Sequence, residues 1–246
     1  IQLVSFAQLS VAYDTINVIE NGKSIKLAWA GGINYSNISN IDLNFDGKKD
    51  IVVFDRSNQF GSAIFKCFIN NGNAGDVKYI HDMMLSSKFP VAKDWAMLLD
   101  YNKDGKEDIF TSTTGGIKVF KNTSTTSGGV SFSLAKTMLV SDYNPTGSPN
   151  ISNLYASNVG VPGLGDVDND NDIDVLTFSP AGFLVEFHKN MSMETYGHAD
   201  SLNKFIIGDL CWGKMQESSC VVSFSQCPFY KQLNLNVTIN QQTLHA

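Results

Sequence analysis

The sequence has few of the features that mark membrane or nucleic-acid-binding proteins. No apolar run among its 246 residues approaches the roughly 18 residues of a membrane-spanning helix. Its 18 basic residues are outnumbered by 24 acidic ones, whereas nucleic-acid-binding domains carry a basic surplus. Arginine occurs once, and long heptad-like helical patterns are absent. What remains is a globular chain, for which an apolar content of 43% is ordinary.

Cysteine is also scarce, and its spacing argues against metal or redox motifs. The chain has four cysteines and no C-x-x-C pair, which disfavours a zinc ribbon or a redox centre. Cys67 lies in an apolar, strand-like run and is expected in the core. If the protein is exported, Cys211 is expected to form a local disulfide with Cys220 or Cys227. The alternative is that these three are free, half-buried thiols.

The two ends of the chain carry only weak signals. The chain begins without Met, and residues 1–7 (IQLVSFA) place small side chains two apart, as before a signal-peptidase site. This segment is either the tail of a secretory signal or a first β-strand. The final residues, NLNVTINQQTLHA, contain no terminating feature, so we expect more protein downstream.

The acidic residues are concentrated in three windows of nine residues. Residues 42–50, 100–108 and 166–174 hold 12 of the 24 acids, with four bases. They read DLNFDGKKD, DYNKDGKED and DVDNDNDID, which all fit D-x-[DN]-x-D-[GN]-x-x-D. The net charge of -6 therefore comes from three loops, which sum to -8, and not from the surface at large.

Each window is flanked in the same way by strand-like segments. The following runs are IVVF, IFTS and VLTF, and a further strand-like run ends at Asn70, Asn122 or Asn190. The windows begin 58 and 66 residues apart, which leaves room for about four short strands in each repeat. Repeated four-stranded antiparallel sheets are the blades of a β-propeller. We therefore predict an all-β chain of about three blades in an incomplete propeller, with helix limited to a turn or two around residues 87–98.

The spacing inside each window is typical of a calcium loop. Oxygen-bearing side chains at positions 1, 3, 5 and 9, with the backbone carbonyl of position 7, give about five donors, and water completes the 6–8 oxygens of Ca²⁺. Position 6 needs a sharp bend, where a positive φ is expected. Mg²⁺ is less suited because it keeps several waters, and soft metals lack their cysteine or histidine donors. The predicted ligands are Asp42, Asn44, Asp46, Lys48 and Asp50; Asp100, Asn102, Asp104, Lys106 and Asp108; and Asp166, Asp168, Asp170, Asp172 and Asp174.

The third window departs from the other two, and one competing motif can be excluded. Asn171 stands where the others have Gly, and Asn is the next most tolerant residue of a left-handed conformation. An EF-hand needs a bidentate Glu at position 12, but that position holds Val53, Thr111 or Thr177. A solvated acidic loop is the alternative for any single window, and three copies with one spacing disfavour it. About three Ca²⁺ ions would bring the net charge near zero.

These loops resemble the FG-GAP/VCBS repeat of integrin-α-type β-propellers over about residues 20–200. Stretches such as DWAMLLDYNKDGKEDIFTSTTGGIKVFKN are similar to bacterial secreted VCBS-repeat proteins. The resemblance implies a secreted or cell-surface protein whose calcium loops brace the blades, and an adhesion or interaction module for an unknown protein or glycan ligand. Phe60-Gly61 is a weak match to FG and no GAP occurs, which weakens the integrin comparison but not the calcium loop.

The repeat also divides the chain. We expect residues 8–205 to form the blades, after the ambiguous residues 1–7. A fourth loop at the same spacing would begin near residues 224–232, which read SFSQCPFYK around that point and carry no acid. Residues 206–246 are therefore expected to be a cysteine-containing insertion or the start of a further, truncated blade.

The sequence favours a non-catalytic role. No G-x-S-x-G, H-E-x-x-H or P-loop occurs, and the acids outside the loops share no spacing. His188 and His198 lie in a polar stretch and are expected to be ordinary turn or surface residues, and the aromatics are expected in blade cores. The alternative is the propeller portion of a secreted polysaccharide-degrading or other hydrolytic enzyme whose active site lies outside this segment. A structural spacer is the third hypothesis.

Overall fold

The computed structural model describes residues 18–25, 35–56, 64–73, 76, 78–218, 221–224 and 227. The chain divides into two compact units, Ile1–Ile33 and Asn34–Ala246. The described part of the first unit is a hairpin of β1 (Val18–Glu20) and β2 (Lys23–Ile25). Its turn residues both have positive φ, as the Asn-Gly pair of a tight hairpin favours. The ambiguous segment 1–7 and Cys220 lie outside the described residues.

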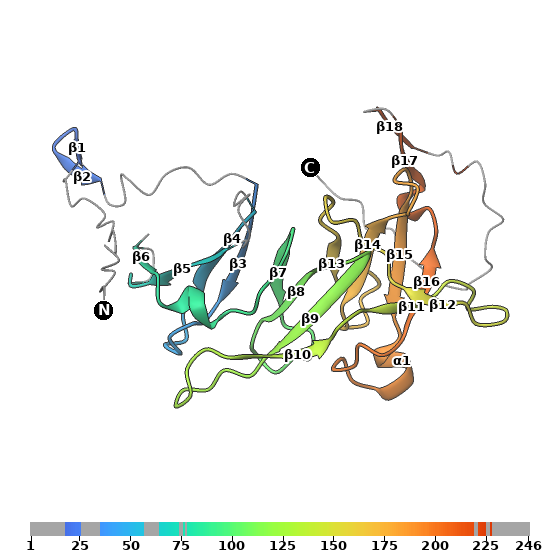
Figure 1. Cartoon of the computed structure of the whole chain (residues 1–246), viewed down its shortest axis with the longest axis horizontal. Coiled ribbons are helices and arrows are strands. Elements are labelled where there is room, and N and C mark those ends of the chain that lie inside the picture. Colours follow the sequence, from blue (N-terminus) through green and yellow to red (C-terminus); the bar gives the residue numbers. More distant parts are fainter. Residues whose placement is uncertain are drawn as a thin grey trace, which may run out of the picture. The chain divides into compact units, whose positions relative to one another are not determined.

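The described part of the second unit contains three large, mainly antiparallel sheets in succession, called here the first, second and third sheets (Figure 1). The first sheet has the strand order β3 (Ser36–Ile41), β4 (Asp50–Asp55), β5 (Ile64–Asn70), β6 (Tyr79–Asp82). The second has the order β7 (Ala96–Leu99), β8 (Asp108–Thr113), β9 (Gly116–Asn122), β10 (Phe132–Lys136). The third has the order β13 (Gly163–Gly165), β14 (Asp174–Phe178), β15 (Val185–Asn190), β16 (Phe205–Asp209). The prediction of an all-β chain with antiparallel sheets is confirmed.

The third sheet is wider than the other two. Strand β11 (Val140–Asp142) pairs in parallel with β16, and β12 (Ile151–Asn153) pairs with β11. In each of these three sheets an acidic window connects the first strand of the repeat to the second, and a strand-like run ending in Asn forms the third strand. Each repeat therefore has the predicted order of strand, acidic loop, strand and strand.

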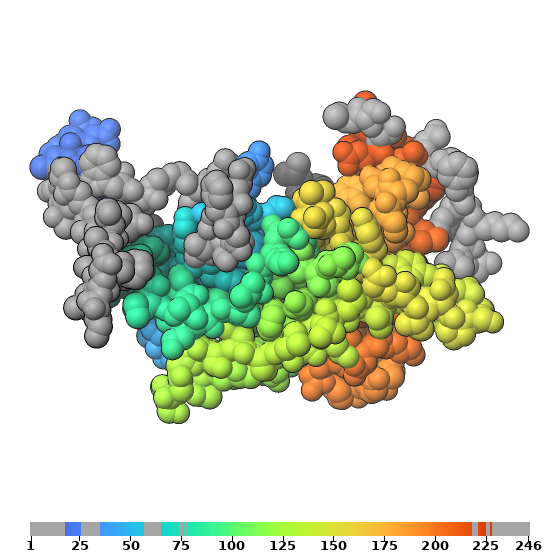
Figure 2. Space-filling model, viewed as in Figure 1, coloured from blue at the N-terminus to red at the C-terminus, as the bar shows by residue number. Residues whose placement is uncertain are grey.

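Two apolar cores lie between the three sheets. Val52, Phe54 and Phe65 of the first sheet pack with Ile109 of the second. The opposite face of the second sheet, with Phe110, joins a separate cluster that includes residues of the third sheet. Strand alternation explains this arrangement, because successive side chains of β8 point to opposite faces. Figure 2 shows the second sheet, in green, between the first and the third.

Neighbouring repeats are also joined at their first strands and at their loops. The backbone N–H groups of Ala96 and Leu98 in β7 donate to side chains of β3, at 3.3 and 3.1 Å. Lys49 and Glu107, which hold position 8 in the first and second loops, form an ion pair. The first two acidic loops therefore lie at the same end of adjacent sheets.

The few remaining elements include one correction. The helical turn predicted around residues 87–98 is a single 3-10 turn at Leu85–Lys88, and Ala96–Leu99 is strand β7, because its apolar residues pair with β8. Helix α1 (Ser192–Tyr196) was not predicted. A second 3-10 turn and a hairpin follow β16, and these are Trp212–Lys214, β17 (Met215–Ser218) and β18 (Val221–Phe224).

The cysteines follow the prediction where the structure describes them. Cys211 forms a disulfide with Cys227, one of the two pairings that the sequence left open. Cys67 is a free thiol and is fully buried in β5. None of the helices in the described part of the chain has the length and apolar content needed to span a bilayer.

Candidate metal centre

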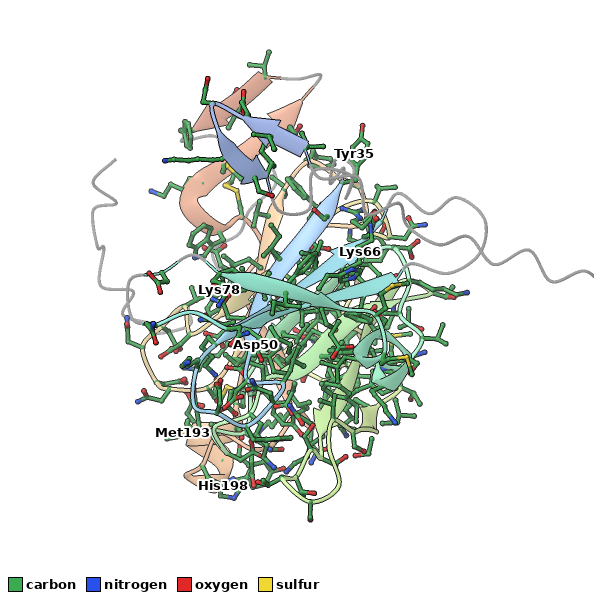
Figure 3. All side chains as sticks on the ribbon, turned by 90° about the vertical axis from the view of Figure 1, so that its left-hand side faces the viewer. Tyr35, Asp50, Lys66, Lys78, Met193 and His198 are labelled. Atoms are coloured by element: carbon green, nitrogen blue, oxygen red, sulfur yellow. A yellow bond between two sulfur atoms is a disulfide. The ribbon has the colours of Figure 1, made fainter. Side chains whose placement is uncertain are left out.

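The aspartate at position 9 of each acidic loop is completely buried at the start of the second strand. Asp50, Asp108 and Asp174 each have 0% exposure (Asp50 is labelled in Figure 3). Each carboxylate accepts two backbone hydrogen bonds of 2.7–3.2 Å, one from position 2 of its loop and one from the Asn that ends the third strand. This residue therefore fastens the loop to the rest of its sheet.

The Asn that ends the third strand completes this connection. Its side-chain oxygen accepts the backbone N–H two residues further on, at 3.0–3.2 Å. Its amide nitrogen donates to a backbone carbonyl, which belongs to position 8 of the loop in the first two sheets and to Ser201 in the third. Sequence reasoning noted Asn70, Asn122 and Asn190 as the ends of strand-like runs but missed that they close the loops.

The aspartate at position 1 organises the middle of each loop. Its two carboxylate oxygens accept the N–H groups of positions 5 and 6, at 2.8–3.2 Å, in all three copies. The aspartate at position 5 accepts the N–H of position 7, at 2.9–3.1 Å. The three loops thus share one hydrogen-bond network.

The backbone of the three loops bends at the same two positions. Position 6 has the predicted positive φ in Gly47 (81°), Gly105 (84°) and Asn171 (75°). Position 4 also has a positive φ, at Phe45 (62°), Lys103 (57°) and Asn169 (65°), which the sequence did not indicate. For a Phe this conformation is uncommon and costs energy, so the surrounding loop imposes it.

The first two loops place a side-chain amide beside the position 5 carboxylate, and the third does not. At position 3, Asn44 and Asn102 each donate from the side-chain amide to the position 5 carboxylate, at 3.1 Å. The third loop has Asp168 there. Lys189 of β15 contacts the carboxylates of Asp168, Asp170 (3.2 Å) and Glu194 instead.

The third loop gathers carboxylates closely enough to hold a metal ion. The carboxylate oxygens of Asp166, Asp168 and Asp174 lie within 4.8 Å of one another, and so do those of Asp168, Asp170 and Glu194. Within the described residues, Asp168 Oδ1 and Asp172 Oδ1 are buried without a hydrogen-bond partner. Buried acceptors are nearly always satisfied, and a bound cation would satisfy these two oxygens.

Burial raises the pKa of several of these carboxyls and so disfavours their ionised form. Burial raises the pKa of Asp108 to about 7 and that of Asp174 to about 8, although two backbone N–H groups oppose it in each case. Burial, followed by nearby acids, also raises the pKa of Asp172 to about 7. A divalent cation beside a carboxyl favours its ionised form, so these acids fit a hard, oxygen-binding ion.

Position 7 differs between the loops. Lys48 and Lys106 donate from their ammonium groups to the carbonyls of Gly72 (3.0 Å) and Ser124 (3.3 Å), and Lys48 Nζ also lies 4.0 Å from Asp46 Oδ2. Asp172 is fully buried, and its Oδ2 accepts the N–H of Met193 at 3.1 Å. The predicted role of position 7 uses only its backbone carbonyl, so sequence reasoning missed this link between the third loop and α1 (Met193 is labelled in Figure 3).

The prediction for His188 was wrong. His188 is completely buried in β15, with its Nδ1 2.9 Å from Ser141 Oγ and its Nε2 3.3 Å from Glu186 Oε2. The reason is that β11 joins the third sheet, so that Ser141 and the adjacent Tyr143 contact the His188 side chain, which no local pattern indicates. His198 lies in an exposed turn beside Asp200, as predicted.

A polar cavity of about 610 Å³ lies at the opposite end of the strands from the acidic loops. It is bordered by the segment before β7, the β8–β9 turn and residues 155–158. Asp94 in its wall has a positive φ of 56°, and its carboxylate accepts the Ser112 hydroxyl at 2.5 Å. Lys93, Lys118 and Tyr155 contribute further polar groups.

Comparisons with known proteins assign no family to the chain, so a function has to be argued from the geometry of the site. No protein-family model matches the chain, and no curated protein matches it.

Proposed function

We propose that this protein is a calcium-binding β-propeller of the FG-GAP/VCBS type, which acts at the cell surface or after secretion as a non-catalytic interaction module. The observation that carries the calcium assignment is the third loop. It holds carboxylate oxygens that are buried, close together and without a hydrogen-bond partner. The other two loops repeat its backbone network and its two left-handed bends.

The residues present fit Ca²⁺ in each loop. The side-chain oxygens of positions 1, 3, 5 and 9 and the carbonyl of position 7 are all hard oxygen donors, which Ca²⁺ prefers. When bound, the ion would supply positive charge to carboxyls that burial now disfavours in their ionised form. Its role is structural, because an ion that binds only the folded chain adds to the free energy of unfolding.

The propeller assignment is supported by how the sheets succeed one another. Each repeat is a set of four consecutive antiparallel strands, and both faces of the second sheet are covered by its neighbours. The first strands of the first two sheets are adjacent and linked by hydrogen bonds. Blades around a common axis pack face to face in this way.

The disulfide supports an exported protein. Cys211 and Cys227 are bonded, and disulfides persist mainly in oxidising compartments.

The cavity opposite the acidic loops is the proposed ligand site, and its chemistry favours a glycan. Asp94 and Lys93 offer a hydroxyl acceptor and a donor, and Tyr155 offers a ring against which a sugar can lie. Asp94 holds a backbone conformation that costs energy, and such strain concentrates at functional sites.

Thermal unfolding tests the calcium assignment. The melting temperature of the full chain is expected to rise steeply with Ca²⁺, less with Mg²⁺, and to fall on addition of a chelator. A melting temperature that is the same in excess chelator and in millimolar Ca²⁺ would sink the assignment.

A glycan array on the full chain tests the ligand site. Asp94→Asn is expected to weaken the binding of the best glycan by tenfold or more. Asp200→Asn is the matched control, because Asp200 is an exposed carboxylate that lines a different polar cavity beside α1. If no glycan binds, or if Asp200→Asn abolishes binding while Asp94→Asn does not, this cavity is not the site.

A further inference from the structure

The residue before the closing Asn differs between the three repeats. It is Ile69 in β5, Lys121 in β9 and Lys189 in β15. The two lysines occupy equivalent places, each one residue before the Asn that binds the buried position 9 aspartate. Their surroundings differ greatly, which makes them a natural pair for comparison.

Lys189 is much more enclosed than Lys121. The side chain of Lys121 is 43% exposed, and its Nζ lies 3.7 Å from one carboxylate, that of Asp104. The side chain of Lys189 is 13% exposed, and its Nζ contacts the carboxylates of Asp168, Asp170 and Glu194. The ammonium group of Lys189 thus sits among three carboxylates whose oxygens lie close enough together to bind a metal ion.

We propose that Lys189 is a built-in cation of the third loop, which holds that loop in its folded shape without metal and lowers its affinity for Ca²⁺. This inference rests on the proposed calcium function and assigns a determinant of affinity within it. Asp168 and Asp170 would serve both cations, because they contact Lys189 and also belong to the predicted ligand set.

The geometry explains both effects. Lys189 binds Asp168 through Oδ2 and leaves Oδ1 without a partner, so one oxygen remains for a metal ion. A divalent ion that bound there would lie close to the ammonium group, and like charges at such distances repel strongly where water is limited. Repulsion by Lys189 should therefore weaken the binding of the ion to the third loop. The first repeat has the uncharged Ile69 at this place, so its loop lacks this repulsion.

Without metal, the same ammonium group should keep the third loop formed. The loop contains five aspartates and is joined by Glu194, and Lys189 offsets part of their repulsion. Through Glu194 it also ties the loop to α1. In the first two loops the amide of Asn44 or Asn102 has the corresponding place, and an amide carries no charge. The nearby ammonium groups of Lys48 and Lys121 are more exposed, and each lies near a single loop carboxylate, at 4.0 and 3.7 Å.

A single calcium titration of the full chain, followed by NMR, can monitor Ca²⁺ binding to each of the three loops separately. The N–H of position 6 donates to the position 1 aspartate in each loop, so the amide resonances of Gly47, Gly105 and Asn171 report their own loops. Lys189→Met keeps the length of the side chain and removes its charge. We expect it to tighten Ca²⁺ binding at Asn171 by about tenfold and to leave Gly47 and Gly105 unchanged.

Lys121→Met is the matched control. We expect its effect on Ca²⁺ binding at Gly105 to stay within about twofold, because the exposed Lys121 has a screened contact with one carboxylate. Unchanged or weaker binding at Asn171 in Lys189→Met overturns the proposal, since a purely structural lysine would lower stability without tightening the site. A wild-type chain whose three amides all ignore Ca²⁺ refutes the proposed function itself.

A second measurement needs no variant and covers the case in which Lys189→Met does not fold. In the wild-type chain with chelator, amide hydrogen exchange is expected to be slower at Asn171 than at Gly47 and Gly105, because of the three loops only the third has an enclosed ammonium group in contact with three carboxylates. Equal or faster exchange at Asn171 overturns the proposal.

Discussion

The second and third acidic loops have nearly the same backbone and nearly opposite surroundings. Both place a buried aspartate at position 9, with two backbone N–H groups on its carboxylate. At position 3, however, Asn102 donates an amide hydrogen to its neighbour, whereas Asp168 depends on Lys189 from another strand. The backbone network is thus the constant part of the repeat, and the source of positive charge is the variable part.

The difference separates what shapes a loop from what sets its affinity for an ion. The carboxylates of positions 1, 5 and 9 accept hydrogen bonds from backbone N–H groups, so these bonds do not depend on which side chains fill positions 2, 4 and 7. Those positions hold Tyr101, Lys103 and Lys106 in one loop and Val167, Asn169 and Asp172 in the other. Charge can therefore change between repeats while the loop keeps its shape.

The largest effect is expected when the shared backbone hydrogen-bond network of the loops is broken. Asp108→Ala and Asp174→Ala should each lower the free energy of unfolding by about 3 kcal/mol, because each leaves two buried backbone N–H groups without an acceptor. Urea denaturation in chelator measures this without the contribution of metal. Asp200→Ala, at an exposed site, should cost less than about 0.5 kcal/mol. Losses that differ widely between the two loops would show that the network is not the common element.

The disulfide is a second difference between the repeats. Within the described residues, it cross-links the segment that follows the third sheet, and the other two sheets have no such bond. Cys211→Ser should lower the free energy of unfolding by about 2 kcal/mol, since the bond closes a loop with a sequence separation of 16. Denaturation with and without reductant measures the change, and the variant should lose the effect of the reductant. Cys67→Ser is the control for thiol chemistry, because reductant should still destabilise that chain.

The closing asparagines should show a graded effect. Asn122 and Asn190 are 2% and 1% exposed, and their replacement by Ala should cost about 1.5 kcal/mol each through lost and unsatisfied hydrogen bonds. Asn70 is only half-buried, so Asn70→Ala should cost about 0.5–1 kcal/mol because water replaces part of what is lost. Equal losses at all three positions, measured by urea denaturation, would contradict this dependence on burial.

The features that could be predicted from the sequence involve residues that lie close together in the chain. The strands beside each loop, the bend at Gly47 and Gly105, the tolerance of Asn171 and the burial of Cys67 all follow from spacing and residue type. The interactions that it did not indicate join residues 14–21 apart, such as Asn122 with Asp108 or Lys189 with Asp168. Their contact depends on the register of the second and third strands, which no single motif specifies. The burial of His188 likewise depends on β11, a strand from outside the four-strand repeat.

The smallest expected effect compares the two residues that provide the left-handed bend at position 6. Gly105 has a φ of 84° and Asn171 a φ of 75°, and Gly adopts this conformation without the penalty that a Cβ atom brings. Asn171→Gly should therefore raise the free energy of unfolding by about 0.5 kcal/mol, and Gly105→Asn should lower it by a similar amount. A Cβ atom at Gly105 would meet nothing within 4 Å, so no clash adds to the conformational cost. Paired urea denaturation curves resolve the two shifts, and shifts of the same sign would mean that the two bends are not equivalent.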